Sequence, residues 1–333
     1  MFSTLSTIYL FFGGAGAGCC VVSAVLTLSL VLKSDSTYIG VSHLPSVNVP
    51  SFFSQSALRR LKAILNMIGL AALIFGAACL SLDLGRADRA LLLFLSPTFS
   101  YLSVGAFLLL ATILLSGSAC VFDVMQPPFN VSRTAAFILT MFLIATSLGT
   151  MTYTGLLLTS LTQVHLWNSP FIVALFVLSS LSCGAAVTMV VGMFEEAEEA
   201  TVRVIPLVVK VDTVILVVEI IIALVWCATT LETNTYAQPA AANLFLGEDA
   251  TLSGLWWGGF IALGAAVPLV IEIVMRVRVR SHLIGELSLR KALLALAGVL
   301  IVVGAFCMRF SIAEAGLSRM DSSSQIVWSQ TDE

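Results

Sequence analysis

Tyr153 is the residue whose position most directly suggests chemistry. It lies about nine residues from the end of an apolar stretch that closes near residue 162. A phenol hydroxyl surrounded by apolar residues needs a hydrogen-bond partner. In a membrane-spanning helix this depth is too great for the aromatic belt at the membrane surface. The partner is therefore either a neighbouring helix or the carbonyl group of a bound ligand.

Ser6 and Tyr9 form a second polar pair, one helical turn apart near the start of the sequence. The run GGAGAG at 13–18 follows them, and small residues at this spacing let another helix approach closely. Such packing explains the glycines but not the two hydroxyl groups. Tyr9 is placed either to anchor the helix at the membrane surface or to bind a ligand.

Acidic residues inside otherwise apolar stretches are further candidates, because a charge in a membrane is costly unless it is paired. Glu219 and Glu272 lie in two such stretches and could form part of a proton path. Glu272 also lies one turn before Arg276, and we expect these two residues to pair at the membrane boundary. For Glu219, both a structural role and a role as proton relay stay open.

Composition places these residues in a membrane protein. The sequence is 59% hydrophobic and 11% charged, with a mean hydropathy of +1.03, which is too apolar for a water-soluble core. Apolar runs that can cross about 30 Å of hydrocarbon occur about eight times. Their glycine and alanine content favours helices over a barrel. They lie near 7–32, 63–82, 97–122, 134–162, 169–194, 205–230, 253–275 and 291–313.

Positive charges in the loops predict the orientation of these helices. With the N-terminus outside, the inner loops hold twelve Lys and Arg residues and the outer ones hold three. We therefore expect both termini on the outer, periplasmic face. The first segment lacks the basic start of a signal peptide and is predicted to be a retained helix.

Small-residue runs at 13–18 and 179–186 suggest two four-helix bundles repeated in parallel. We treat both as one polytopic transmembrane domain over 1–316, followed by a polar C-terminal tail over 317–333.

Several kinds of site are excluded by the residues. The seven cysteines lie within predicted helices and lack the C-x-x-C spacing of a metal or iron–sulfur centre. All three histidines lie in loops, so haem ligands facing a bundle interior are missing. There is no phosphate-binding glycine motif, and the loops are too short for an enzyme domain. We expect the protein to act within the bilayer, or through partner proteins rather than nucleic acid.

Five short motifs follow one another along the sequence: YLFFGGAGAG from Tyr9, SPTFSY from Ser96, YTG from Tyr153, WNSP from Trp167 and GAFCMRF at 304–310. Together they resemble the NrfD/polysulfide reductase membrane-subunit family, over nearly the whole sequence and in the expected order.

This resemblance implies an eight-helix membrane subunit without a haem or iron–sulfur centre of its own. Such a subunit exchanges electrons between a menaquinone- or ubiquinone-type quinone and a partner iron–sulfur subunit, which serves a molybdopterin catalytic subunit. The family holds the quinone headgroup near the outer face, at positions that correspond to Ser6, Tyr9 and Tyr153. The sequence departs from the best-studied type of pocket, which has Asn and His in the first helix.

The turn between the fourth and fifth predicted helices would then be the docking edge for the partner. Gln163, Trp167 and Asn168 are the predicted docking residues. His165 is a candidate proton relay, with a solvated loop histidine as the alternative.

We therefore expect a membrane anchor subunit of a respiratory oxidoreductase complex in the bacterial cytoplasmic (inner) membrane. It would have a quinol oxidation or reduction site of its own, with terminal catalysis in a partner subunit. A secondary transporter or permease is the alternative, since eight glycine-rich helices with a repeat and buried carboxylates would also serve transport.

Overall fold

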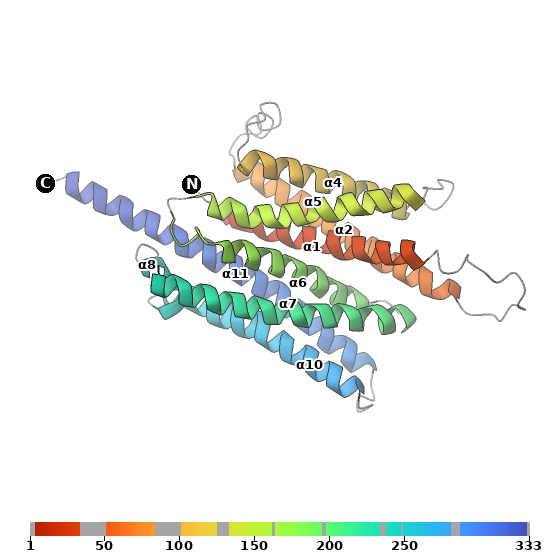
Figure 1. Ribbon diagram of the computed structural model, residues 1–333. Coiled ribbons are helices and arrows are strands. Elements are labelled where there is room, and N and C mark those ends of the chain that lie inside the picture. Colours follow the sequence, from red (N-terminus) through yellow and green to blue (C-terminus); the bar gives the residue numbers. More distant parts are fainter. Residues whose placement is uncertain are drawn as a thin grey trace, which may run out of the picture.

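The computed structural model describes residues 4–33, 51–83, 101–124, 133–161, 164–194, 198–233, 238–247, 249–280 and 287–331. Every regular element within these residues is a helix (Figure 1). The elements are α1 (Thr4–Lys33), α2 (Ser51–Asp83), α4 (Tyr101–Val124), α5 (Arg133–Thr159), α6 (Pro170–Phe194), α7 (Glu198–Thr233), α8 (Gln238–Ala241), η1 (Ala242–Leu246), α9 (Ala250–Ser253), η2 (Gly254–Ala266), α10 (Val267–Arg280) and α11 (Leu287–Thr331). Of these, η1 and η2 are π-helical.

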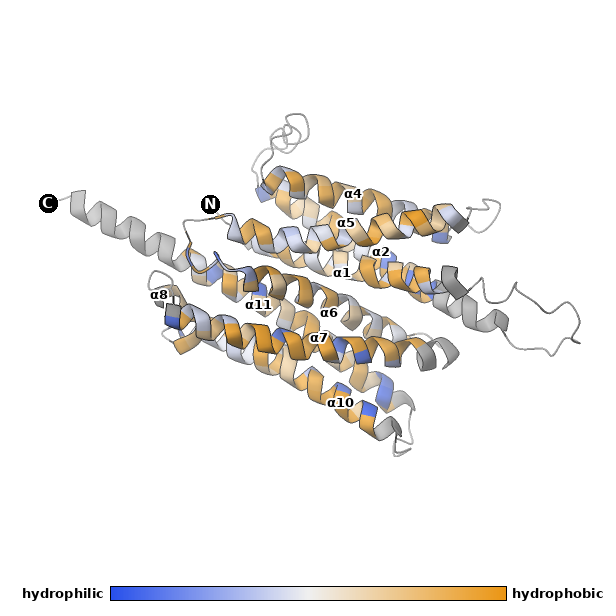
Figure 2. Cartoon of the chain, in the orientation of Figure 1, coloured by the Kyte–Doolittle hydropathy of each residue, from blue (hydrophilic) through white to orange (hydrophobic). Residues whose placement is uncertain are grey.

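The described residues contain eight helices that are long and apolar enough to cross a membrane. The first span is Leu5–Ser29 and the last is Leu289–Leu317. The seventh, Ala250–Val277, joins α9, η2 and α10 into one crossing. Apolar residues run along these helices, with a few hydrophilic positions inside α7 and α10 (Figure 2). The prediction of an all-helical membrane protein with eight crossings is confirmed.

The crossings form two bundles of four (Figure 1). The first bundle contains α1, α2, α4 and α5, and the second contains α6, α7, α10 with η2, and α11. α1 and α6 lie at the seam, where 78% and 61% of their spans are buried, against 28% for α4. The remaining helices expose apolar side chains to the lipid, as a bilayer requires.

Glycines allow α1 and α6 to cross closely at the seam. A Cβ atom added to Gly18 would lie 3.2 Å from the backbone nitrogen of Gly184 and would overlap the carbonyl of Ser180. The two backbones therefore touch, as small residues permit in membranes. The small-residue runs of the sequence thus mark the contact between the two bundles.

Both termini lie at the same end of the bundles (Figure 1). We call it the outer end, following the loop charges, and that assignment stays a prediction. The predicted polar tail begins at residue 317, but the backbone of α11 continues as a helix to Thr331.

Candidate functional site

The outer half of α1 places Ser6 and Tyr9 inside the first bundle. Residues three apart on a helix lie on the same face, and the exposed fraction is 5% for Ser6 and 0% for Tyr9. Tyr9 is therefore not a residue of the aromatic belt, which needs a ring at the lipid and water boundary. The sequence leaves two roles open for Tyr9, anchoring the helix at the membrane surface and binding a ligand. Its burial removes the first role.

Tyr153 enters the same region from α5, and it too is buried. Its ring lies directly against Gly105 of α4, because a Cβ atom built on this glycine would fall among the ring atoms. A Cβ atom on Gly13 would make only ordinary van der Waals contact with the Tyr9 ring, 3.4 Å from its Cε2 atom. Gly105 is therefore the glycine that lets α4 pack against the tyrosines of α1 and α5.

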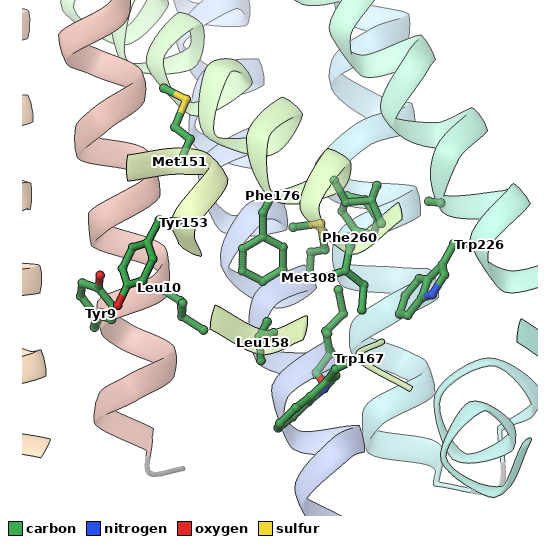
Figure 3. Close-up of a cluster of buried hydrophobic side chains, with 14 of the residues drawn as sticks. Tyr9, Leu10, Met151, Tyr153, Leu158, Trp167, Phe176, Trp226, Phe260 and Met308 are labelled. Atoms are coloured by element: carbon green, nitrogen blue, oxygen red, sulfur yellow. The ribbon is translucent and has the colours of Figure 1, made fainter. Parts of the chain in front are cut away.

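The hydroxyl groups of Tyr9 and Tyr153 face one another in the interior (Figure 3). The two hydroxyls interact with each other but form no hydrogen bond of normal geometry, and neither has another hydrogen-bond partner among the described residues. A buried hydroxyl without a partner costs about 1–3 kcal/mol, and such groups are uncommon enough to need an explanation. Both can donate to an acceptor, so the pair suits a neutral ligand with carbonyl oxygens. A quinone headgroup is such a ligand.

Ser6 adds a third polar group, one helical turn from Tyr9 toward the outer end of α1. Its hydroxyl donates a hydrogen bond to Oδ2 of Asp83, at the outer end of α2. Because the proton points at the carboxylate, the oxygen of Ser6 is left as an acceptor. Ser6 therefore suits the hydroxyl of a quinol better than the carbonyl of a quinone. Asp83 lies 77 positions away and has no motif that marks it in the sequence.

Trp167 offers no exposed ring for the predicted contact with a partner protein. Trp167 is fully buried, and its Nε1–H donates to the carbonyl of Ile312 at 2.9 Å. A Cβ atom on Gly316 would enter the indole ring, so α11 packs directly on it. Trp167 thus attaches the turn before α6 to the last helix.

The other residues predicted in this turn differ in position. His165 and Asn168 are exposed at the outer end of the bundles. Asn168 also lines a groove of about 820 Å³ whose other walls come from α5, α6 and α7. Gln163 lies outside the described residues. The docking and relay roles of these three residues stay predictions.

The second bundle contains a fully buried arginine, Arg309 of α11. Its Nη1 donates to Ser179 Oγ and its Nη2 to Ser180 Oγ, both at 2.8 Å. The guanidinium also lies over the ring of Phe176, 5.0 Å from the ring centre. Glu219 of α7 is buried beside Ser179 and Arg309, so the intramembrane acid has a cationic neighbour.

Glu272 and Arg276 are joined through a hydroxyl group. Thr213 Oγ1 donates to Glu272 Oε2 at 2.8 Å and accepts from Arg276 Nη2 at 2.9 Å. The pairing predicted for these residues is therefore bridged rather than direct. Asp212, next to Thr213, accepts from Ser182 Oγ at 2.7 Å and extends this buried polar group to α6.

Comparison with known proteins gives a family match over nearly the whole sequence and curated relatives over little more than half of it. Residues 1–321 match the model of a family described as polysulphide reductase, NrfD. Among curated proteins, the C chain of the polysulfide reductase of Wolinella succinogenes is 26% identical over 196 residues, which is 59% of the present sequence and 58% of that protein. The NrfD homolog of Haemophilus influenzae is 26% identical over 180 residues, 53% of the present sequence and 51% of that protein. The matched region thus spans between half and three fifths of each relative.

Proposed function

We propose that this protein, which belongs to the polysulphide reductase NrfD family, is the quinone-binding anchor subunit of a respiratory complex. It is a multi-pass integral protein of the bacterial inner membrane. The observation that supports quinone binding is the pair of buried hydroxyls of Tyr9 and Tyr153, which have no hydrogen-bond partner among the described residues beyond each other. The family match favours this function over a secondary transporter.

Each polar group has a defined task in this proposal. Tyr9 and Tyr153 donate hydrogen bonds to a carbonyl oxygen of the headgroup and orient it between α1, α4 and α5. Ser6, held by Asp83, accepts a hydrogen bond from the reduced form. A bound quinone supplies two-electron, two-proton chemistry, which the protein's own residues do not provide. The apolar walls around the rings exclude water from the site.

Electrons would be exchanged with an iron–sulfur subunit that docks at the outer end, next to a molybdopterin catalytic subunit. The relative from Wolinella is named as the C chain of its reductase, and this designation supports a place among several subunits. Asn168 and His165 are the described exposed residues of the turn at that end, and Gln163 joins them in the proposed docking edge.

Two proton carriers are also proposed. His165 would exchange protons with the solvent at the outer end, where its ring is accessible. Glu219 would hold a proton within the second bundle, because a buried carboxyl group beside serine hydroxyls can gain and lose one. Replacing each residue by glutamine and measuring quinol oxidation tests each role separately.

The quinone site is tested with Tyr9→Phe and Tyr153→Phe in the assembled complex. Each change removes one donor from the site, so a quinone-site inhibitor should bind about tenfold more weakly, as expected for about 1.4 kcal/mol. Quinol oxidation should fall together with inhibitor binding. Tyr101→Phe is the matched control, because that tyrosine is 61% exposed.

The measurements are inhibitor titration and initial rates with a quinol analogue, together with thermal unfolding to show that each variant folds. If both buried variants bind the inhibitor and oxidise quinol as the wild type does, the hydroxyl pair does not bind a quinone.

A further inference from the structure

Two carboxyl groups meet inside the second bundle, in the half nearer the predicted inner end. Asp212 comes from α7 and Glu272 from α10, and both side chains are fully buried. Both residues lie within membrane-spanning segments. Their carboxyl groups interact with each other. Two carboxylates in contact repel one another, and in a membrane interior their charge has to be neutralised.

Each carboxyl group has one oxygen that is already bonded and one that is not. Asp212 Oδ1 accepts from Ser182 Oγ at 2.7 Å, and Glu272 Oε2 accepts from Thr213 Oγ1 at 2.8 Å. The other two oxygens, Asp212 Oδ2 and Glu272 Oε1, are buried without a hydrogen-bond partner among the described residues beyond the opposite carboxyl group. Oxygens buried in this way need either a proton or a metal ion between them.

The hydroxyl groups around the pair stabilise negative charge. Ser182 and Thr213 both donate to a carboxyl oxygen, and hydrogen bonds of this kind favour the charged form. Arg276 adds a positive charge on the far side of Thr213, because its Nη2 donates to Thr213 Oγ1 at 2.9 Å. Burial, in contrast, disfavours a bare charge. A cation bound between the two carboxylates satisfies both requirements.

The buried acids of the second bundle outnumber the cations that face them. Glu219 has Arg309 as its cationic neighbour. Glu272 is joined to Arg276 through a hydroxyl group. Asp212 interacts with both of these acids, and no cation is among its interactions with the described residues. Three carboxyl groups thus face two guanidinium groups. One monovalent cation balances the remaining charge, whereas a divalent ion would leave an excess.

The available ligands favour a small, hard cation. Carboxylate and hydroxyl oxygens suit such ions, while nitrogen and sulfur ligands suit transition metals. The Ser182 oxygen keeps its lone pairs after donating to Asp212, so it adds a third possible ligand. Because the two carboxyl groups are in contact, the room between them is small. Cavity size contributes to ion selectivity, and this site suits Na⁺ better than the larger K⁺.

We propose that Asp212 and Glu272 bind one sodium ion through Asp212 Oδ2 and Glu272 Oε1. The ion joins α7 to α10, and Ser182 attaches α6 to the same centre. Its role is structural, since it neutralises the carboxylates that hold these three helices together. The site belongs to the second bundle, away from the tyrosine pair, and does not depend on the proposed quinone function.

Thermal unfolding of the purified full-length protein in detergent tests the site. NaCl, KCl and choline chloride are compared at one pH and one ionic strength, so that only the cation differs. An ion that binds only the folded protein stabilises it by mass action, so the Tm should rise with NaCl by at least about 3 °C and reach a plateau. KCl should raise it less, and choline chloride should not raise it. Equilibrium dialysis with radioactive sodium should give one bound ion per chain.

Asp212→Asn and Glu272→Gln each remove one negative charge and keep the shape of the side chain. Neither variant should bind radioactive sodium, and each should have the same Tm in all three salts. Loss of a purely structural carboxylate would lower the Tm but leave the difference between the salts unchanged. Glu232→Gln is the matched control, because it makes the same change at an exposed position of α7 and should keep the wild-type response.

Two results would overturn the proposal. The wild type could unfold at the same temperature in NaCl and in choline chloride, which would show that the carboxyl pair shares a proton instead. Both variants could also keep the wild-type response to NaCl, which would place the ion elsewhere. If Asp212→Asn does not fold, Glu272→Gln removes the same charge from the opposite helix. Quinone binding is judged separately, through Tyr9→Phe and Tyr153→Phe.

Discussion

Single hydroxyl groups explain most of the proposed chemistry. Tyr9 and Tyr153 come from helices far apart in the sequence, and each hydroxyl is buried with no partner among the described residues beyond the other tyrosine. An unmade hydrogen bond of this kind lowers stability by about 1–3 kcal/mol. Binding of a carbonyl ligand would recover that free energy, so these hydroxyls are better explained by a ligand than by helix packing.

Gly105 of α4 should be as important for the proposed quinone site as Tyr153, whose ring lies against it. An added Cβ atom would fall among the ring atoms of Tyr153, so Gly105→Ala must displace the ring. We expect Gly105→Ala to weaken a quinone-site inhibitor at least as much as Tyr153→Phe does. Inhibitor titration and thermal unfolding of the complex measure the two effects.

Gly117 is the matched control on the same helix, because a Cβ atom there would meet nothing within 4 Å. Gly117→Ala should leave inhibitor binding unchanged and raise stability by up to about 1 kcal/mol, the difference in helix propensity. Equal inhibitor affinities for both alanine variants would show that the ring of Tyr153 is not held against α4 as described.

At the level of elements, the seam between α1 and α6 determines how the bundles meet. The two backbones touch near Gly18 and Gly184. α1 also provides Tyr9 on its outer half, and it contacts the second bundle through Gly14 and Arg309. One helix therefore connects the proposed quinone site with the buried arginine of the other bundle.

Gly184→Ala should separate these two helices. Its Cβ atom would overlap the Gly18 carbonyl, which is backbone and cannot rotate away. Overpacking of this kind costs about 1–3 kcal/mol, so we expect a clear fall in Tm. Thermal unfolding of the purified protein is the measurement.

Gly258→Ala is the comparison for the seam, since its Cβ atom would meet nothing within 4 Å. It should leave the Tm close to that of the wild type. A Gly184→Ala protein as stable as Gly258→Ala would contradict the close crossing.

For the molecule as a whole, the direction of insertion determines what the site can do. Both termini lie at the end of the bundles that holds Tyr9 and Tyr153 (Figure 1). If this end is periplasmic, as the loop charges predict, the headgroup of the proposed quinone site lies near the outer face.

Reporter fusions at the C-terminus test this orientation. Alkaline phosphatase, which is active only in the periplasm, should be active there, while a green fluorescent protein that folds only in the cytoplasm should stay dark. Fusions in the 125–132 and 281–286 loops should show the opposite pattern. A fluorescent C-terminal fusion would show the opposite orientation and place the tyrosine pair near the cytoplasmic face.

The sequence by itself determined the membrane class, the eight helices and the family. These properties can be predicted from the length and composition of each segment separately, because a bilayer requires a long apolar helix at each crossing. The candidate residues Ser6, Tyr9 and Tyr153 were also found in this way, since polar groups stand out in apolar stretches and in short motifs.

Only the tertiary structure decided which of these groups meet. The sequence could not show that Tyr153 lies on Gly105, that Asp83 binds Ser6, or that Trp167 is buried under α11. The physical reason is that these helices are apolar on nearly all sides, so no polar face marks the direction of the neighbour. Partners in a membrane are selected by close packing between helices, and such contacts leave no local pattern in the sequence.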